Sequence, residues 1–207
     1  AGLIGGLVVM VTESNQDLWR EARDSSVPVV VVDQDVRDAG VDSVLIDNEE
    51  GTRQAVLHLL EHLPPDRCFF IGGPATNFDT QQRSHVFAQT LQSRGGASGV
   101  TKDGSKVANR QMLFRSYTVE WGEQAIKQLI EREGKAPLGV LAGNDEIAYG
   151  VLRAAQRANV QVPKHIRVVG FDDSRLASLL QPSLSSVRVP RQEVGAAAIT
   201  TLVRRMD

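Results

Sequence analysis

Short apolar runs alternate with longer segments of helical periodicity along the chain. The runs are rich in β-branched residues and nearly continuous in apolar character. They therefore predict strands that are buried on both faces of a parallel sheet. The runs cover residues 4–11, 28–33, 43–46, 68–71, 138–142 and 166–170.

The segments between these runs place apolar residues three and four positions apart, which is typical of amphipathic helices. Residues 49–63, for example, carry Val56, Leu59 and Leu63 on one helical face. Further helices are predicted at 119–131, 145–159 and 192–203, and another begins near Arg83. Strand–helix alternation indicates a doubly wound α/β fold, because a (β/α)8 barrel typically needs about 250 residues.

Composition and charge narrow the classes of partner. The 207 residues carry a formal charge of -2, so the chain lacks the broad basic surface that phosphate-backbone binding requires. Any DNA-reading segment would therefore lie outside these residues. The single cysteine, Cys68, lies in the apolar run CFFIGG and is expected to be a buried small hydrophobe in a reducing compartment. The apolar runs are too short to span a bilayer.

Polar side chains follow five of the predicted strands. Any one of them could be a helix cap, because Asp and Asn accept hydrogen bonds from the first free N–H groups of a helix. Together, at one edge of a parallel sheet, they predict a polar pocket whose amides and carboxylates suit a ligand with several hydroxyls. The polar residues are Asp33-Gln34-Asp35, Asp47-Asn48, Thr76-Asn77 with Asp79, Asn144-Asp145 and Asp172-Asp173.

The pair Asn144-Asp145, in VLAGNDEIAYG, raises the choice between cap and ligand contact most directly. Asp145 stands at the start of the predicted helix, so we expect it to be the cap. Asn144 stands at the end of the strand, so we expect it to be the ligand contact.

Catalytic and metal chemistry have little support. The segment His58-Leu-Leu-Glu61-His62 matches the HxxEH pattern of zinc peptidases, but it lies in an ordinary amphipathic helix without a clear third ligand. The Gly-, Ser- and Lys-rich segment 92–110 lacks the P-loop spacing and predicts a surface loop. No GxSxG motif is present. We therefore expect no enzyme activity, no metal and no cofactor.

The order of the motifs resembles that of a known family. The most specific segments are LAGNDEIAYGVLRA at 141–154 and VPKHIRVVGFDDSRLASLLQPSLSSVRVPRQEVGAAAITTL at 162–202. SVPVVVVDQDV, VLIDNEEGTRQAVLHLLEHL and FFIGGP support them. Together these segments resemble the effector-binding domain of LacI/GalR transcriptional regulators, whose core is shared with periplasmic sugar-binding proteins.

The resemblance implies a periplasmic-binding-protein-like fold of type I, with two Rossmann-like subdomains that have parallel sheets. Residues 1–72 with 191–207 would form a partial N-terminal subdomain, and residues 73–187 the C-terminal one. A ligand would bind in the cleft between them. The family's helix-turn-helix, hinge helix, first two βα units and last strand have no counterpart in the sequence, so we expect a longer protein.

The resemblance also implies a set of site residues. Arg83 would bind ligand hydroxyls or a carboxylate, Asn144 and Asp172 would hydrogen-bond to ring hydroxyls, and Tyr117 would stack on the ligand. Asp33 from the first subdomain and Asn77 from the loop after FFIGGP would complete the site.

As a function, the resemblance implies a cytoplasmic, homodimeric regulator that senses a sugar or a related metabolite. It would bind operator DNA through a domain outside these residues and have no membrane contact. Two alternatives remain open at this point. One is a transport-associated periplasmic sugar-binding protein, and the other is the same sensor domain fused to another output module.

Overall fold

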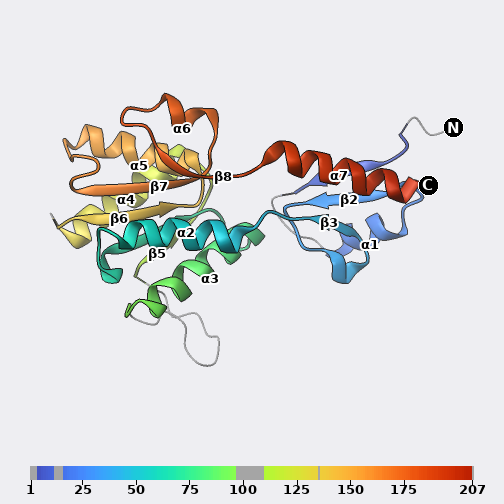
Figure 1. The fold of residues 1–207 in the computed structure, drawn as a ribbon, viewed down its shortest axis with the longest axis horizontal. Helices are drawn as coiled ribbons and strands as arrows, with labels where there is room; N and C mark the ends of the chain where they lie inside the picture. Colours follow the sequence, from blue (N-terminus) through green and yellow to red (C-terminus); the bar gives the residue numbers. More distant parts are fainter. Residues whose placement is uncertain (1–3, 12–15, 97–109, 135, 207) are drawn as a thin grey trace. The chain divides into compact units, whose positions relative to one another are not determined.

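The computed structural model describes residues 4–11, 16–96, 110–134 and 136–206, and it divides the chain into two compact units (Figure 1). Unit 1 consists of residues 1–47, 76–79 and 190–207, and unit 2 of residues 48–75 and 80–189. Most of the predicted surface loop at 92–110, namely residues 97–109, lies outside the described residues.

Unit 1 is built on a parallel sheet with the strand order β1–β2–β3. Alternate residues of β2 point to opposite faces, so Val31 packs with Trp19 and the other face of the strand packs with Ala198 and Leu202. The elements are β1 (Leu7–Met10), α1 (Gln16–Asp24), β2 (Val29–Val32), the 3-10 turn η1 (Arg37–Ala39), β3 (Asp42–Val44) and α7 (Arg191–Met206).

Strand β1 differs from the sequence prediction. It lies at an edge of the described sheet, and Leu7 and Met10 are 45% and 67% exposed. The continuous apolar run therefore predicts the strand correctly, but the prediction that the strand is buried on both faces is wrong.

Unit 2 contains the larger sheet, which is parallel throughout and has the strand order β5–β4–β6–β7–β8. Strands β4 and β6 are buried at every residue, as their apolar runs predict. The strands are β4 (Cys68–Gly72), β5 (Met112–Phe114), β6 (Leu138–Ala142), β7 (Ile166–Asp172) and β8 (Ser185–Arg188).

Helices cover both faces of this sheet, as Figure 1 shows. Phe70 packs with α2 and α3 on one face, while Phe69 and Ile71 pack with α4 and α5 on the other. This is the doubly wound α/β arrangement that the sequence predicted. The helices are α2 (Asn48–Leu60), the 3-10 turn η2 (Pro65–Arg67), α3 (Phe78–Ser93), α4 (Val119–Glu133), α5 (Asp145–Arg157) and α6 (Arg175–Leu179).

The division into units moves the predicted domain boundary. Residues 48–72 were expected in the N-terminal subdomain, but α2 packs against the larger sheet and β4 pairs with β5 and β6 inside it. The five polar strand ends accordingly belong to two sheets and not to one edge. The sheet that holds β4, β6 and β7 carries three of them.

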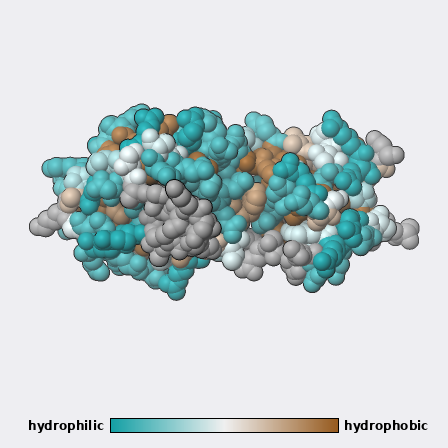
Figure 2. All heavy atoms as spheres, turned by 90° about the horizontal axis from the view of Figure 1, so that it is seen from below, coloured by the Kyte–Doolittle hydropathy of each residue, from teal (hydrophilic) through white to brown (hydrophobic). Residues whose placement is uncertain are grey.

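Cys68 is fully buried in β4, and burial raises the pKa of its thiol to about 12. The thiol is therefore protonated and packs as the small hydrophobe that the sequence predicted. The face drawn in Figure 2 is mostly hydrophilic, with scattered hydrophobic side chains. Within the described residues, the helices include none with the length and apolar character needed to cross a membrane.

Candidate ligand-binding site

The strand order of unit 2 contains one reversal, between β4 and β6. From β4 the chain passes through α3 to β5 on one side, and then through α4 on the opposite face to β6 on the other side. The loops that follow β4 and β6 therefore diverge from the carboxyl edge of the sheet. In open α/β sheets, ligands bind at such a switch point.

Arg83 reaches this switch point from α3. It is only 4% exposed, its Nη1 donates to the carbonyl oxygen of Gly143 over 2.7 Å, and its Nε donates to Oδ1 of Asn48 over 2.7 Å. The guanidinium carbon lies 3.7 Å from the centroid of the Phe171 ring, which is a cation–π contact. Arg83 is therefore an oriented, buried cation and not the solvated surface arginine that its position alone would equally allow.

The helix cap expected at Asp145 is supplied by Asn144 instead. Asn144 is the N-cap of α5, because its backbone is extended and its Oδ1 accepts from the amide of Ile147 over 2.9 Å. Asp145 is 1% exposed and accepts hydrogen bonds from the amide and hydroxyl of Ser174 and the hydroxyl of Ser186. Asp145 thus ties α5 to the segment after β7. Asn144 retains its Nδ2 donors for a ligand.

Asp172 is the last residue of β7 and follows Phe171, whose ring lies beneath the Arg83 guanidinium. Its φ of 117° and that of Asp173, 48°, are positive, a backbone conformation that costs non-glycine residues on the order of 1–3 kcal/mol. The amide of Asp173 donates to the hydroxyl of Ser186, which holds the turn in place. The sheet therefore brings Arg83, Asn144 and Asp172 to one edge.

Tyr117 joins the same region through α3. Its hydroxyl lies 2.6 Å from Oγ1 of Thr80, and its ring occupies the space that a Cβ on Gly73 would need, at 2.4 Å from that position. Gly73 follows β4 directly. The ring therefore lies over the loop between β4 and α3.

The remaining two predicted residues belong to unit 1. Asp33 follows β2 and has a positive φ of 61°. Asn77 immediately precedes α3 and is 7% exposed.

Two residues that build the site have only weak signals in the sequence. Asn48 stands there as one of several polar strand ends, yet it is 1% exposed and also donates from Nδ2 to Oε1 of Gln82 over 2.9 Å. Phe171 belongs to an apolar run and predicts only core packing. Its contact with Arg83 depends on the tertiary fold.

This arrangement offers hydrogen-bond donors and acceptors but has no nucleophile–base pair among the residues described above. The HxxEH segment lies elsewhere, at the end of α2 and in the turn after it, with the His58 and His62 rings 6.0 Å apart. Across the described ranges, no group of three or more His, Cys, Asp or Glu side chains is placed to hold a metal ion. The chemistry of the site fits binding of a polar small molecule.

Residues 56–207 match the model of the periplasmic binding protein-like domain. The chain belongs to this family. That match covers most of the chain, including all three residues that meet at the sheet edge. The parallel α/β architecture of both units agrees with it.

Relatives of this periplasmic binding protein-like chain are bacterial regulators. It is 28% identical over 204 residues to catabolite control protein A of Priestia megaterium, covering 99% of the chain and 58% of the relative. It is 31% identical over 195 residues to the HTH-type transcriptional regulator MalR of Streptomyces coelicolor, and this alignment covers 94% of the chain and 54% of MalR. It is 28% identical over 205 residues to the ribose operon repressor of Escherichia coli, and this alignment covers 98% of the chain and 58% of the repressor. The chain thus spans less than two thirds of the length of these relatives.

Solved structures of transcriptional regulators agree with these sequence relationships. A LacI-family transcriptional regulator from Burkholderia phymatum superposes with a TM-score of 0.81 at 25% identity, covering 98% of this chain and 70% of that one. The complex of the regulator CelR with cellobiose has a TM-score of 0.84 at 24% identity, covering 99% and 60%. The resemblance to the effector-binding domain of LacI-family regulators is thereby confirmed.

Proposed function

We propose that this chain is the effector-sensing domain of a DNA-binding transcriptional regulator and that its ligand is a sugar or a related polyhydroxylated metabolite. One observation carries the proposal. The buried guanidinium of Arg83 is fixed at the switch point of the larger sheet, next to the ends of β6 and β7. An oriented donor of this kind beside amide and carboxylate groups suits vicinal hydroxyls.

Each residue has a distinct role in this proposal. Arg83 donates to ligand oxygens, Asp172 accepts from hydroxyls, and Asn144 donates from Nδ2, since its Oδ1 caps α5. Tyr117 offers an aromatic face for a sugar ring to stack on. Oriented hydrogen bonds to hydroxyls and an apolar stacking face together distinguish a sugar from a flat apolar ligand.

Asp33 and Asn77 of unit 1 stay predicted ligand residues. A ligand that prefers one conformation of the regulator favours that conformation when it binds. It can shift the equilibrium only by the difference between its affinities for the two conformations. The regulator would use that shift to change its affinity for operator DNA, as a homodimer in the cytoplasm, and no bond would be made or broken.

The test is calorimetry of the full-length protein with a panel of sugars and purines, followed by operator binding with and without each ligand. We expect a sugar to bind and to change operator affinity, and we expect Arg83→Ala and Asp172→Ala to abolish both effects. If no ligand binds and both variants leave operator affinity and induction unchanged, the site assignment is wrong. Sugar binding without any DNA binding by the full-length protein would instead support a transport role.

A further inference from the structure

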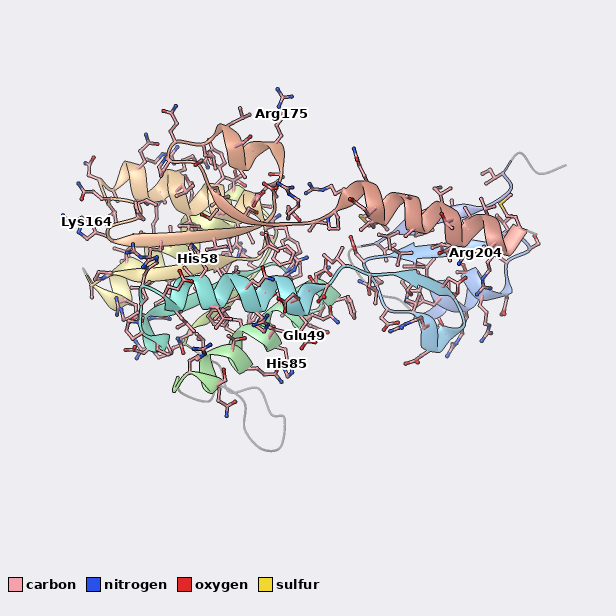
Figure 3. The ribbon with its side chains drawn as sticks, viewed as in Figure 1. Glu49, His58, His85, Lys164, Arg175 and Arg204 are labelled. Atoms are coloured by element: carbon pink, nitrogen blue, oxygen red, sulfur yellow. The ribbon has the colours of Figure 1, made fainter. Side chains whose placement is uncertain are left out.

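Unit 2 has a cavity of about 440 Å³ at the edge of its sheet opposite to Arg83. Its walls come from the last part of α2, the start of β7, and the segments that precede β7 and β8. In parallel βα units these parts lie at the amino ends of the strands. Figure 3 labels Glu49 at the start of α2 and His58 toward the other end of that helix. The cavity is therefore separate from the carboxyl-edge site.

The polar side chains of this cavity are basic or neutral. His58 near the end of α2 and His62 in the turn just after it line the cavity together with Arg167 of β7 and the hydroxyls of Ser183 and Ser185. The lining includes no aspartate or glutamate among the residues that the structure describes. Oε2 of Glu61 lies 3.5 Å from Nδ1 of His58, but the Glu61 side chain is 65% exposed. The cavity thus presents donors without a competing buried anion.

Arg167 gives a second observation in favour of an anionic ligand in this cavity. Its Nη1 donates to the carbonyl oxygen of Pro163 over 2.5 Å, while its Nε is buried and has no acceptor within the described part of the chain. A buried donor without a partner costs about 1–3 kcal/mol. An anionic oxygen bound in the cavity would supply the acceptor that Nε lacks, once the side chain shifts enough to expose this atom.

The rest of the wall is apolar, with aliphatic side chains such as Leu59, Leu152 and Leu184. The volume lies within the usual range for small-molecule sites, roughly 300–1,000 Å³. An inorganic ion would leave this apolar surface uncovered. A ligand with an anionic head and an apolar body would cover both parts of the cavity.

We propose that this cavity binds a small organic anion, with a phosphate monoester or carboxylate head that Arg167, His58 and His62 recognise. The head accepts hydrogen bonds from the guanidinium and imidazole groups, and the apolar body packs on the aliphatic wall. Charge-assisted hydrogen bonds to such a head are about twice as strong as neutral ones. The site is independent of the proposed sugar site, because it lies at the other edge of the sheet.

The test uses phenyl phosphate as the probe and benzyl alcohol as its neutral counterpart, with the full chain followed by proton NMR of the histidine rings. We expect phenyl phosphate to shift the resonances of His58 and His62. The resonance of His85, which is exposed on α3 and labelled in Figure 3, should stay in place. Benzyl alcohol should bind at least about tenfold more weakly. Equal shifts with both compounds, or no shift of His58 and His62, would overturn the proposal.

Variants separate binding from folding. Arg167→Gln should weaken phenyl phosphate binding at least about tenfold, and Arg175→Gln, which changes an exposed arginine, should not. Ser183→Asp keeps the cavity wall intact and places a carboxylate at its exposed rim, so it should also abolish binding by repulsion. If Ser183→Asp and Arg167→Gln both bind the probe as tightly as the unaltered chain, the cavity is not an anion site.

Discussion

Nε of Arg83 lies 2.7 Å from Oδ1 of Asn48, and this hydrogen bond joins α3 to the first residue of α2. Both side chains are at most 4% exposed. The bond, together with the bond from Nη1 to Gly143, fixes the plane of the guanidinium. Asn48 therefore positions Arg83 before any ligand arrives, which lowers the ordering cost of binding.

Replacing Arg83 with lysine tests this orientation. A lysine keeps the charge but cannot donate to Asn48 and Gly143 in the same fixed plane. We expect Arg83→Lys to weaken sugar binding by about tenfold or more and to lower the free energy of unfolding by about 1–3 kcal/mol, because a buried acceptor loses its donor. Calorimetry and urea unfolding measure the two effects. Arg53→Lys, on an exposed arginine of α2 that pairs with Glu50, should change neither.

The buried carboxylate of Asp145 is expected to stabilise unit 2. It accepts three hydrogen bonds, two from Ser174 and one from Ser186, at 2.6–2.7 Å. Asp145→Ala would leave these donors without their acceptor, so we expect a loss of about 3 kcal/mol in the free energy of unfolding. Urea unfolding measures it. Glu146→Gln, at the exposed neighbouring position, is the control and should have little effect, and an equal loss in both variants would refute the role.

The sequence predicted the long, strongly periodic elements well. Strands β4 and β6 and helix α4 lie where apolar runs and helical spacing placed them. Helix α1 and strands β5 and β8 were not predicted. Helix α1 has only nine residues and is mostly polar, although its apolar residues Leu18, Trp19 and Ala22 share one face. The two strands are short and partly exposed, so their residues carry little periodic signal.

For the candidate site, residue type at the strand ends pointed to Asn144 and Asp172, whereas Arg83, which lies within a helix, was implied only by the resemblance to LacI/GalR regulators. That Asn144 and not Asp145 caps α5 could not be predicted, because both residue types can cap a helix and only the backbone conformation decides which one does. The contact between Asn48 and Arg83 joins residues 35 positions apart, so it depends on the packing of α2 against α3. Sequence patterns report local periodicity and do not encode such pairings.

A methyl group added at two helical glycines is expected to have opposite effects on stability. A Cβ on Gly150 of α5 would lie 2.0 Å from the carbonyl oxygen of Val119, whereas a Cβ on Gly195 of α7 has nothing within 4 Å. The backbone of α4 cannot move aside by changing a rotamer. We therefore expect Gly150→Ala to destabilise unit 2 by about 1–3 kcal/mol. Gly195→Ala should stabilise unit 1 by about 0.5–1 kcal/mol through helix propensity.

Thermal and urea unfolding of the two variants check this contrast. The pair is matched, since each change adds one methyl group to a helix interior. If both substitutions change the free energy of unfolding in the same direction, α4 and α5 do not approach as closely as the structure has them.

A carboxylate between α4 and α5 predicts a pH dependence. Oε1 of Glu123 accepts from Nε of Arg153 over 2.5 Å and from Nη1 of Arg157 over 2.7 Å, and its side chain is only 12% exposed. The hydrogen bond from Arg153 lowers the pKa of Glu123, with smaller electrostatic contributions from Arg153, Arg157 and Lys127. Folding thus favours the charged carboxylate.

The sign of the effect follows from this lowered pKa. The stabilisation by Glu123 is fully present above the pKa of an unfolded glutamate, about 4.3, and is lost as the pH falls through the lower pKa of the folded state. Glu123→Gln should therefore unfold at a lower urea concentration than the unaltered chain at pH 7, and the difference should shrink below about pH 4. Urea midpoints at several pH values measure it. A difference that is constant with pH would show that the glutamine acts through packing and not through the lost charge.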